Sequence, residues 1–169
     1  MALIGVLIAD NFEDVEYTKP VKAFTEAKHS LIHIGLKKNQ RVKGKRNIST
    51  VKIDQSFSDV KPDSLDAVLI PGGCSPDNLR GEKEPVEFIK EFEQTKKPIF
   101  AICHAPQLLI TADLIKGRKI TGWKSIVQDI KNAGAIYINQ EVVEDNNIIT
   151  SRGPKDIPAF IKSSLKRLE

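Results

Sequence analysis

The sequence predicts an α/β fold in which a mainly parallel central sheet is covered by helices on both faces. Short apolar runs alternate along the 169 residues with segments whose apolar residues recur at helical spacing. No repeat, low-complexity tract or linker interrupts this alternation, so residues 1–169 are expected to form a single domain. A chain of this length can bury a full hydrophobic core.

The apolar runs predict the strands. Four of them read as core strands, at residues 3–9, 31–36, 66–70 and 98–102, and three shorter strands are expected at 136–138, 142–143 and 148–150. Helical spacing predicts five helices, marked by Val21, Phe24 and Ala27, by Val86, Ile89 and Phe92, by Pro106, Leu108 and Leu109, by Ile126 and Ile130, and by Ile157, Ile161 and Leu165.

Composition and charge exclude several function classes. The two cysteines make no disulfide framework, which indicates a cytoplasmic protein. The run from Met1 to Ala9 has no basic region before it and is expected to be a strand, not a signal peptide. No apolar stretch approaches the ~20 residues that a membrane span requires, so no membrane partner is expected.

A basic cluster holds much of the formal charge of +4. It lies around a polar turn between Val42 and Val51–Ile53, which predicts a side hairpin. No aromatic residues are interleaved for base stacking, so we favour a solvated hairpin over a nucleic-acid surface. The cluster consists of Lys37, Lys38, Arg41, Lys43, Lys45 and Arg46.

Three loops with unusual chemistry follow predicted strands: 10–14, 71–75 and 103–106. Ligands of such sheets bind at the carboxyl ends of the strands. The sequence therefore predicts that these three loops meet in one site.

Cys103 is the predicted nucleophile of this site. It lies between a strand and a helix start, where a sharp turn, the helix dipole and free N–H groups favour a reactive thiolate of lowered pKa. An inert buried cysteine is the alternative. His104 is expected to act as general acid and base, with its backbone N–H facing the reacting oxygen; the alternative is a histidine that only caps the helix.

Glu13 is predicted to be the acid partner of the sulfur. A carboxyl group desolvated beside a thiolate has a raised pKa and can stay protonated as a donor. The alternative is a helix N-terminal acid, a role that Asp14 and Glu16 fit better. Gly72 and Gly73 are expected to supply oxyanion-hole N–H groups, unless they form an ordinary turn.

Trp123 is assigned with these glycines to substrate binding. The sequence contains no metal-ligand cluster, Walker loop or Gly-x-Gly-x-x-Gly, so neither a metal nor another cofactor is expected. Cys74 follows Gly73 and introduces a second thiol near the first. We favour a small buried filler there over a resolving thiol that would trap oxidised Cys103 as a disulfide.

Taken together, these motifs resemble the ThiJ/PfpI superfamily, and specifically its PfpI-like branch. The resemblance covers nearly the whole chain and rests on residues 11–16 (NFEDVE), 66–73 (DAVLIPGG), 101–107 (AICHAPQ), 114–118 (LIKGR), 132–135 (NAGA) and 151–152 (SR). The chain departs from the usual pattern at Cys74, Ala105, Arg46 and Gly153.

The resemblance implies a flavodoxin-like three-layer sandwich, similar to the class I glutamine amidotransferase domain. It implies Cys103 as nucleophile, Glu13 as the protonated carboxyl touching it and His104 as acid/base. It also implies a homodimer or hexamer, in which Asp77 of a neighbouring subunit orients the histidine.

Three functions remain open at this point. In the first, which we favour, a stress-response hydrolase uses Cys103 against reactive carbonyls or glycated adducts, as a glyoxalase or deglycase does. In the second, the same pair cleaves peptides, as in a PfpI-type peptidase. In the third, the protein is a non-catalytic redox sensor or chaperone-like stress protein whose Cys103 is oxidised.

Overall fold

A mainly parallel seven-stranded sheet forms the middle of the molecule, which confirms the predicted class. The computed structural model describes residues 1–169, and its strand order is β10-β11-β7-β6-β1-β2-β5. Every pairing is parallel except the antiparallel pair β10–β11. The strands are β1 (Leu3–Leu7), β2 (Ser30–Gly35), β5 (Gln55–Ser56), β6 (Ala67–Ile70), β7 (Ile99–Ile102), β10 (Val143–Asp145) and β11 (Ile148–Ser151).

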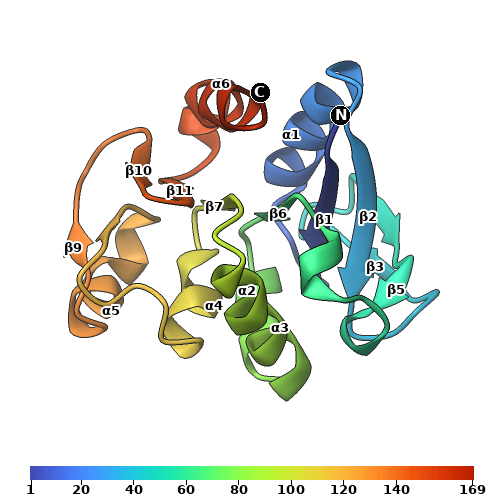
Figure 1. Cartoon of the computed structure of the whole chain (residues 1–169), viewed down its shortest axis with the longest axis horizontal. Helices are drawn as coiled ribbons and strands as arrows, with labels where there is room; N and C mark the ends of the chain where they lie inside the picture. The colour runs from blue at the N-terminus through green and yellow to red at the C-terminus, as the bar shows by residue number, and fades with distance from the viewer.

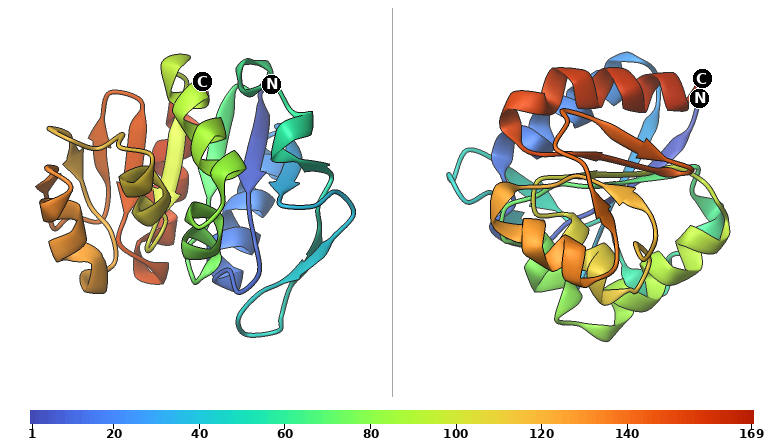
Figure 2. Two further views of the ribbon diagram at one scale, coloured as in Figure 1. Left: turned by 90° about the horizontal axis from the view of Figure 1, so that it is seen from below. Right: turned by 90° about the vertical axis from the view of Figure 1, so that its left-hand side faces the viewer.

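Helices cover both faces of this sheet and complete a flavodoxin-like sandwich of three layers. The helices α1 and α6 lie on one face, and α2, α3, α4 and α5 lie on the other (Figures 1 and 2). Their bounds are α1 (Asp14–Glu26), α2 (Ser75–Arg80), α3 (Lys83–Gln94), α4 (Pro106–Thr111), α5 (Val127–Asn132) and α6 (Ile157–Arg167). None of these helices combines the length and apolarity needed to cross a membrane.

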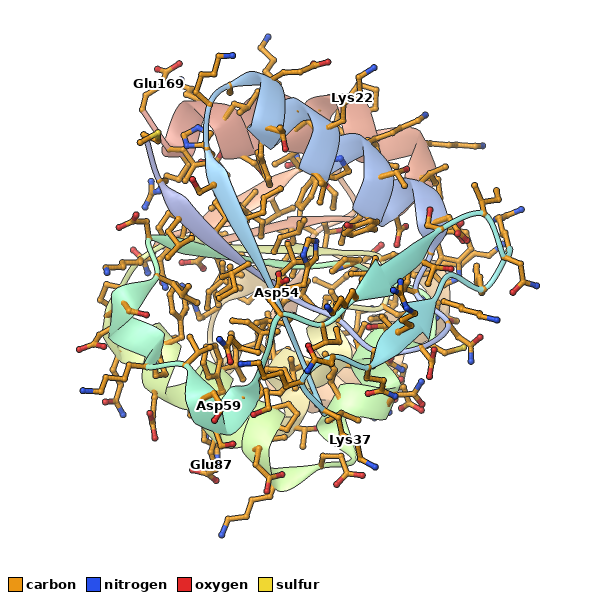
Figure 3. The ribbon with its side chains drawn as sticks, turned by 90° about the vertical axis from the view of Figure 1, so that its right-hand side faces the viewer. Lys22, Lys37, Asp54, Asp59, Glu87 and Glu169 are labelled. Atoms are coloured by element: carbon orange, nitrogen blue, oxygen red, sulfur yellow. The ribbon has the colours of Figure 1, made fainter.

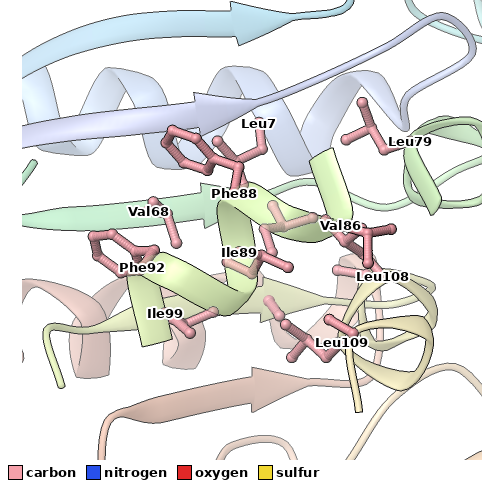
Figure 4. Close-up of a cluster of buried hydrophobic side chains, with 14 of the residues drawn as sticks. Leu7, Val68, Leu79, Val86, Phe88, Ile89, Phe92, Ile99, Leu108 and Leu109 are labelled. Atoms are coloured by element: carbon pink, nitrogen blue, oxygen red, sulfur yellow. The ribbon is translucent and has the colours of Figure 1, made fainter. Parts of the chain in front are cut away.

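Each face of the sheet has its own core. The apolar stripe of α3 packs against the side chains that β1, β6 and β7 present on that face (Figure 4), and Val68 and Ile99 are fully buried there. On the other face, the ring centroids of Phe24 and Phe100 are 5.9 Å apart. Because both faces are covered, the central strands are continuous apolar runs without a polar alternate residue.

The side hairpin is also confirmed. Strands β3 (Arg41–Lys43) and β4 (Thr50–Lys52) pair antiparallel outside the main sheet, on the side of the molecule shown in Figure 3. Its tip is tied down by Asp14, whose carboxylate accepts N–H groups from Arg46, Ile48 and Ser49. These N–H donors lower the pKa of Asp14, although burial acts in the opposite direction.

Helix α2 and the two-residue strands β5 and β8 (Lys119–Ile120) were not predicted. Helix α2 has six residues, too few for apolar periodicity to show. Strand β9 (Ile136–Tyr137) lies within the strand expected at 136–138, and it pairs in parallel with β8 apart from the main sheet. Sequence patterns detect elements only when several turns or alternations repeat. The missed helix α2 carries Asp77 and directly follows the glycine loop of the candidate site.

Candidate functional site

The three predicted loops meet at the carboxyl edge of the sheet. Their strands β7, β6 and β1 are neighbours, so the loops that follow them are adjacent. Main-chain hydrogen bonds join them, because the Glu13 N–H donates to the Gly72 carbonyl at 3.1 Å and the Cys74 N–H donates to the Asn11 carbonyl at 2.8 Å. The convergence expected from the sequence is therefore present.

Cys103 occupies a strained elbow between β7 and α4. Its φ of 64° lies in the left-handed region, which is unfavourable for residues other than glycine. Its N–H donates to the Ser151 carbonyl at 2.9 Å, and its own carbonyl accepts the Trp123 N–H at 2.9 Å. The side chain is only 7% exposed, so the surrounding strands hold the sulfur in one place.

The carboxyl group beside this sulfur belongs to Glu16, and the prediction of Glu13 is wrong. Glu16 is fully buried, its Oε1 accepts the Gly72 N–H at 3.0 Å, and its carboxyl group lies beside Cys103, since both side chains approach Gly72 closely. Glu13 precedes the helix in an extended conformation and turns toward the hairpin. There its two oxygens lie 2.7 Å from Lys45 Nζ and 2.9 Å from Arg46 Nε.

Burial determines the charge of Glu16. Desolvation and the nearby Glu13 carboxylate raise the pKa of Glu16 to about 8, so this carboxyl is protonated at neutral pH. Its Oε2 has no hydrogen-bond partner and is free to carry the proton. The protonated donor expected beside the thiol is therefore present, three residues later than predicted.

The thiol itself behaves differently from the sequence prediction. Burial raises the pKa of Cys103, and a Glu16 carboxylate would raise it further. The N–H groups of Gly73 and His104 point at the sulfur and act in the opposite direction, but they do not outweigh desolvation. The prediction of a lowered Cys103 pKa is wrong for this reason, and the thiol requires a base to activate it.

His104 is placed to be that base. Its Nδ1 lies 3.2 Å from Cys103 Sγ, although side chains of adjacent residues often diverge at an elbow. Burial and the charge of Lys45 lower the pKa of His104, while Asp77 acts weakly in the opposite direction. The imidazole is therefore neutral at pH 7 and can accept a proton.

Ser125 is a contact that the sequence did not indicate. Its Oγ lies 3.2 Å from His104 Nε2. A neutral imidazole carries one proton, so an Nε2–H donated to Ser125 leaves the Nδ1 lone pair facing the thiol. Ser125 is exposed and lies 21 residues from His104 in the chain, and a lone serine in a loop carries no recognisable signal.

The two glycines have different roles. The Gly72 N–H is already bound by Glu16, so it is not free for an oxyanion. A Cβ at Gly72 would lie 2.7 Å from the Cβ of Cys103, and this close approach explains the glycine. Gly73 has a φ of 76°, and its N–H faces the sulfur, as the oxyanion-hole prediction requires.

Trp123 lies beside the histidine. Its ring centroid is 6.3 Å from that of His104. It also lines a pocket of about 570 Å³ together with Arg152, Gly153 and Lys155. A Cβ at Gly153 would meet the indole ring at 2.9 Å, so the departure from the family pattern at this position makes room for Trp123.

Asp77 and Cys74 are exposed at the rim. Asp77 accepts a hydrogen bond from Arg80 Nε at 2.8 Å in its own chain. Cys74 is exposed, so the interpretation of a buried filler is wrong, and the resolving-thiol alternative stays a prediction.

For any reaction that uses Cys103 and His104, we expect Ser125→Ala to lower kcat about tenfold with little change in KM. The reason is that the histidine loses the contact that fixes its tautomer. Ser125→Thr should retain most of the activity, since it keeps the hydroxyl. Steady-state kinetics of both variants test this. An equal loss in both would show that packing, not the hydroxyl, is what matters.

The chain is similar to known proteins over nearly its whole length. The model of the DJ-1/PfpI family matches residues 2–167. The chain is 53% identical to "Putative cysteine protease YraA" of Bacillus subtilis, with 98% of each chain covered. It is 50% identical to "Protein/nucleic acid deglycase 2" of Escherichia coli, with 98% of this chain and 96% of that protein covered. It is 51% identical to "General stress protein 18" of B. subtilis, with 98% and 97% covered.

Solved structures agree with this match. A two-domain protein from Anabaena variabilis, with DJ-1/ThiJ/PfpI-like and ferritin-like domains, superposes with a TM-score of 0.97 at 36% identity. The match covers 99% of this chain and 48% of that one, so the chain spans about half its length. The family model spans almost all of the sequence and agrees with the relatives in sequence and structure, so the chain belongs to the DJ-1/PfpI family.

Proposed function

We propose that this protein is a stress-response cysteine hydrolase that acts on small reactive carbonyls or their glycated adducts. One observation carries the proposal: a thiol lies 3.2 Å from a neutral imidazole and beside a buried carboxyl that is protonated at neutral pH. The relative named as a deglycase supports the same chemistry. No bound metal or cofactor is required by this scheme.

In this scheme, His104 Nδ1 accepts the Cys103 proton as the sulfur attacks an aldehyde carbon. The Gly73 and His104 N–H groups stabilise the resulting oxyanion, and the His104 imidazolium then gives it the thiol proton and becomes neutral again. For methylglyoxal, His104 next moves the proton of the former aldehyde carbon to the neighbouring carbon, through an enediolate. This leaves a lactoyl thioester. Water cleaves the thioester, so methylglyoxal and one water give lactate and the free thiol.

The test is lactate release from methylglyoxal by the purified chain. Cys103→Ser serves as the blank, and Cys74→Ser is the matched control, because Cys74 is exposed and lies outside the scheme. Lactate release by wild type and by Cys74→Ser, with none from Cys103→Ser, supports the proposal. Equal release by all three proteins would refute it.

Peptide hydrolysis is a second candidate, favoured by the relative named as a cysteine protease at 53% identity. The same thiol and imidazole would attack a peptide carbonyl, with the pocket beside Trp123 receiving a side chain. Cleavage of fluorogenic peptides by wild type but not by Cys103→Ser would favour this activity. Peroxide-dependent oxidation of Cys103 without turnover of any substrate would favour the redox sensor instead.

The assembly is proposed to be a homodimer or hexamer in which a neighbouring Asp77 approaches His104. The exposed position of Asp77 is compatible with that contact. Sedimentation of wild type and Asp77→Ala, combined with activity at the same protein concentrations, tests both parts of the proposal. A monomer that keeps full activity would contradict them.

A further inference from the structure

The tip of the β3–β4 hairpin, residues 44–49, contacts the loop of Phe12 beside the candidate site. Phe12 forms bridges with Gly44 on one side and with Gly73 on the other, and the Lys45 N–H donates to the Phe12 carbonyl at 2.9 Å. The Gly73 N–H in turn faces the sulfur of Cys103. A short run of backbone therefore connects the hairpin tip to the nucleophile.

This tip carries two cations held by one carboxylate. The Glu13 side chain is 4% exposed and contacts both Lys45 and Arg46, whose side chains are 42% and 60% exposed. Glu13 balances one charge of the pair, and the nearby Asp14 carboxylate also acts on the charge of Arg46. Arg46 uses only its Nε, and an ammonium has three donors, so both cations retain donors for a further anion.

The other acidic side chains nearby have partners of their own or are uncharged. The Asp14 carboxylate is bound by three backbone N–H groups, and Asp77 is paired with Arg80. Glu16 is protonated at neutral pH. The charge of Lys45 acts on Cys103, Glu16 and His104, so this cation lies within electrostatic range of the reacting atoms.

We propose that Lys45 and Arg46 form an anion subsite that binds a carboxylate of the carbonyl substrate. The inference rests on the proposed function and narrows its substrate class to 2-oxoaldehydes that carry a carboxylate, as in 4,5-dioxopentanoate. In the absence of this anion, Glu13 holds the two cations in position through its two ion pairs. The basic hairpin of the sequence is therefore part of the site and not only a solvated face.

The test uses two alkylating reagents of similar size. Iodoacetate is an anion and iodoacetamide is neutral, and the Cys103 sulfur displaces iodide from either one, forming a C–S bond as the C–I bond breaks. We expect the ratio of the iodoacetate rate to the iodoacetamide rate to fall about fivefold in Lys45→Gln, the effect of losing one partly exposed charge pair. Cys74→Ser serves as the background, so that only Cys103 is followed.

Two variants control this measurement. Lys45→Arg keeps the charge and should keep the ratio, and Lys52→Gln removes an exposed cation from the same hairpin away from its tip. An unchanged ratio in Lys45→Gln, or an equal fall in Lys52→Gln, would overturn the anion subsite.

Turnover separates this inference from the proposed function. Wild type should prefer 4,5-dioxopentanoate, a 2-oxoaldehyde with a carboxylate that the same steps convert with one water to 2-hydroxyglutarate, over the neutral methylglyoxal in kcat/KM. Lys45→Gln should lose that preference. If neither carbonyl is consumed but the alkylation ratio still falls, the proposed function fails and the anion subsite is supported. If methylglyoxal is consumed and the ratio does not change, the subsite fails and the function is supported.

Discussion

Glu16→Ala is expected to lower kcat/KM for the carbonyl reaction by about 10²- to 10³-fold, the effect of losing a positioned proton donor. The substitution removes the protonated carboxyl from the sulfur and leaves the Gly72 N–H without its acceptor. Glu13→Ala is the matched variant, because the same group is removed from a position three residues earlier. It should lower kcat/KM for neutral methylglyoxal by less than about tenfold, since Glu13 contacts the hairpin and not the sulfur.

Lactate release and the rate of Cys103 alkylation by iodoacetamide measure the two variants. Thermal unfolding of each protein shows whether a loss of activity is a loss of the fold. If Glu13→Ala were folded but lost more activity than Glu16→Ala, and Glu16→Ala kept nearly full activity, Glu13 and not Glu16 would be the acid partner of the sulfur.

Glu16→Gln is expected to change how stability and activity depend on pH. The native protein keeps the Glu16 proton up to about pH 8, whereas the unfolded chain loses it near the ordinary value of 4.5. Between these values unfolding releases a proton, so the wild-type free energy of unfolding falls as pH rises, by a total on the order of a few kcal/mol. Glutamine has no proton to lose, so the variant should become the more stable protein above pH 8.

Activity should follow the same group. Turnover requires a neutral His104, whose pKa is lowered by burial and Lys45, and a protonated Glu16, whose pKa is about 8, so the wild-type profile is bell-shaped. Glu16→Gln should lose the alkaline limb, because its amide still donates to the sulfur but cannot ionise. Urea unfolding at pH 5, 7 and 9 and a pH–rate profile check both expectations. Parallel pH curves for the two proteins would exclude Glu16 as the titrating group.

Much of the scaffold was predictable from local pattern. The apolar runs at residues 66–70 and 98–102 and the helical stripe of Val86, Ile89 and Phe92 correspond to β6, β7 and α3. Such patterns can be recognised in a sequence because strands and helices that bury one face repeat apolar residues with a fixed period. Cys103 was recognisable for a related reason, since a nucleophile elbow is a local arrangement of strand, turn and helix.

Only the tertiary structure could decide which carboxyl lies beside the sulfur. Glu13 and Glu16 are three residues apart, a spacing that places two residues on the same face of a helix, so the sequence does not distinguish them. In the structure Glu13 precedes α1 in an extended conformation, and only Glu16 lies within the helix. Burial then decided the proton positions, since desolvation raises the pKa of both Cys103 and Glu16 and so leaves activation of the thiol to His104. Ser125 and Lys45 reach the site from distant segments that the packing of the sheet brings together, and no sequence spacing encodes that proximity. Periodicity in a sequence thus determines which elements form, whereas side-chain direction and desolvation depend on contacts between elements that only the folded chain contains.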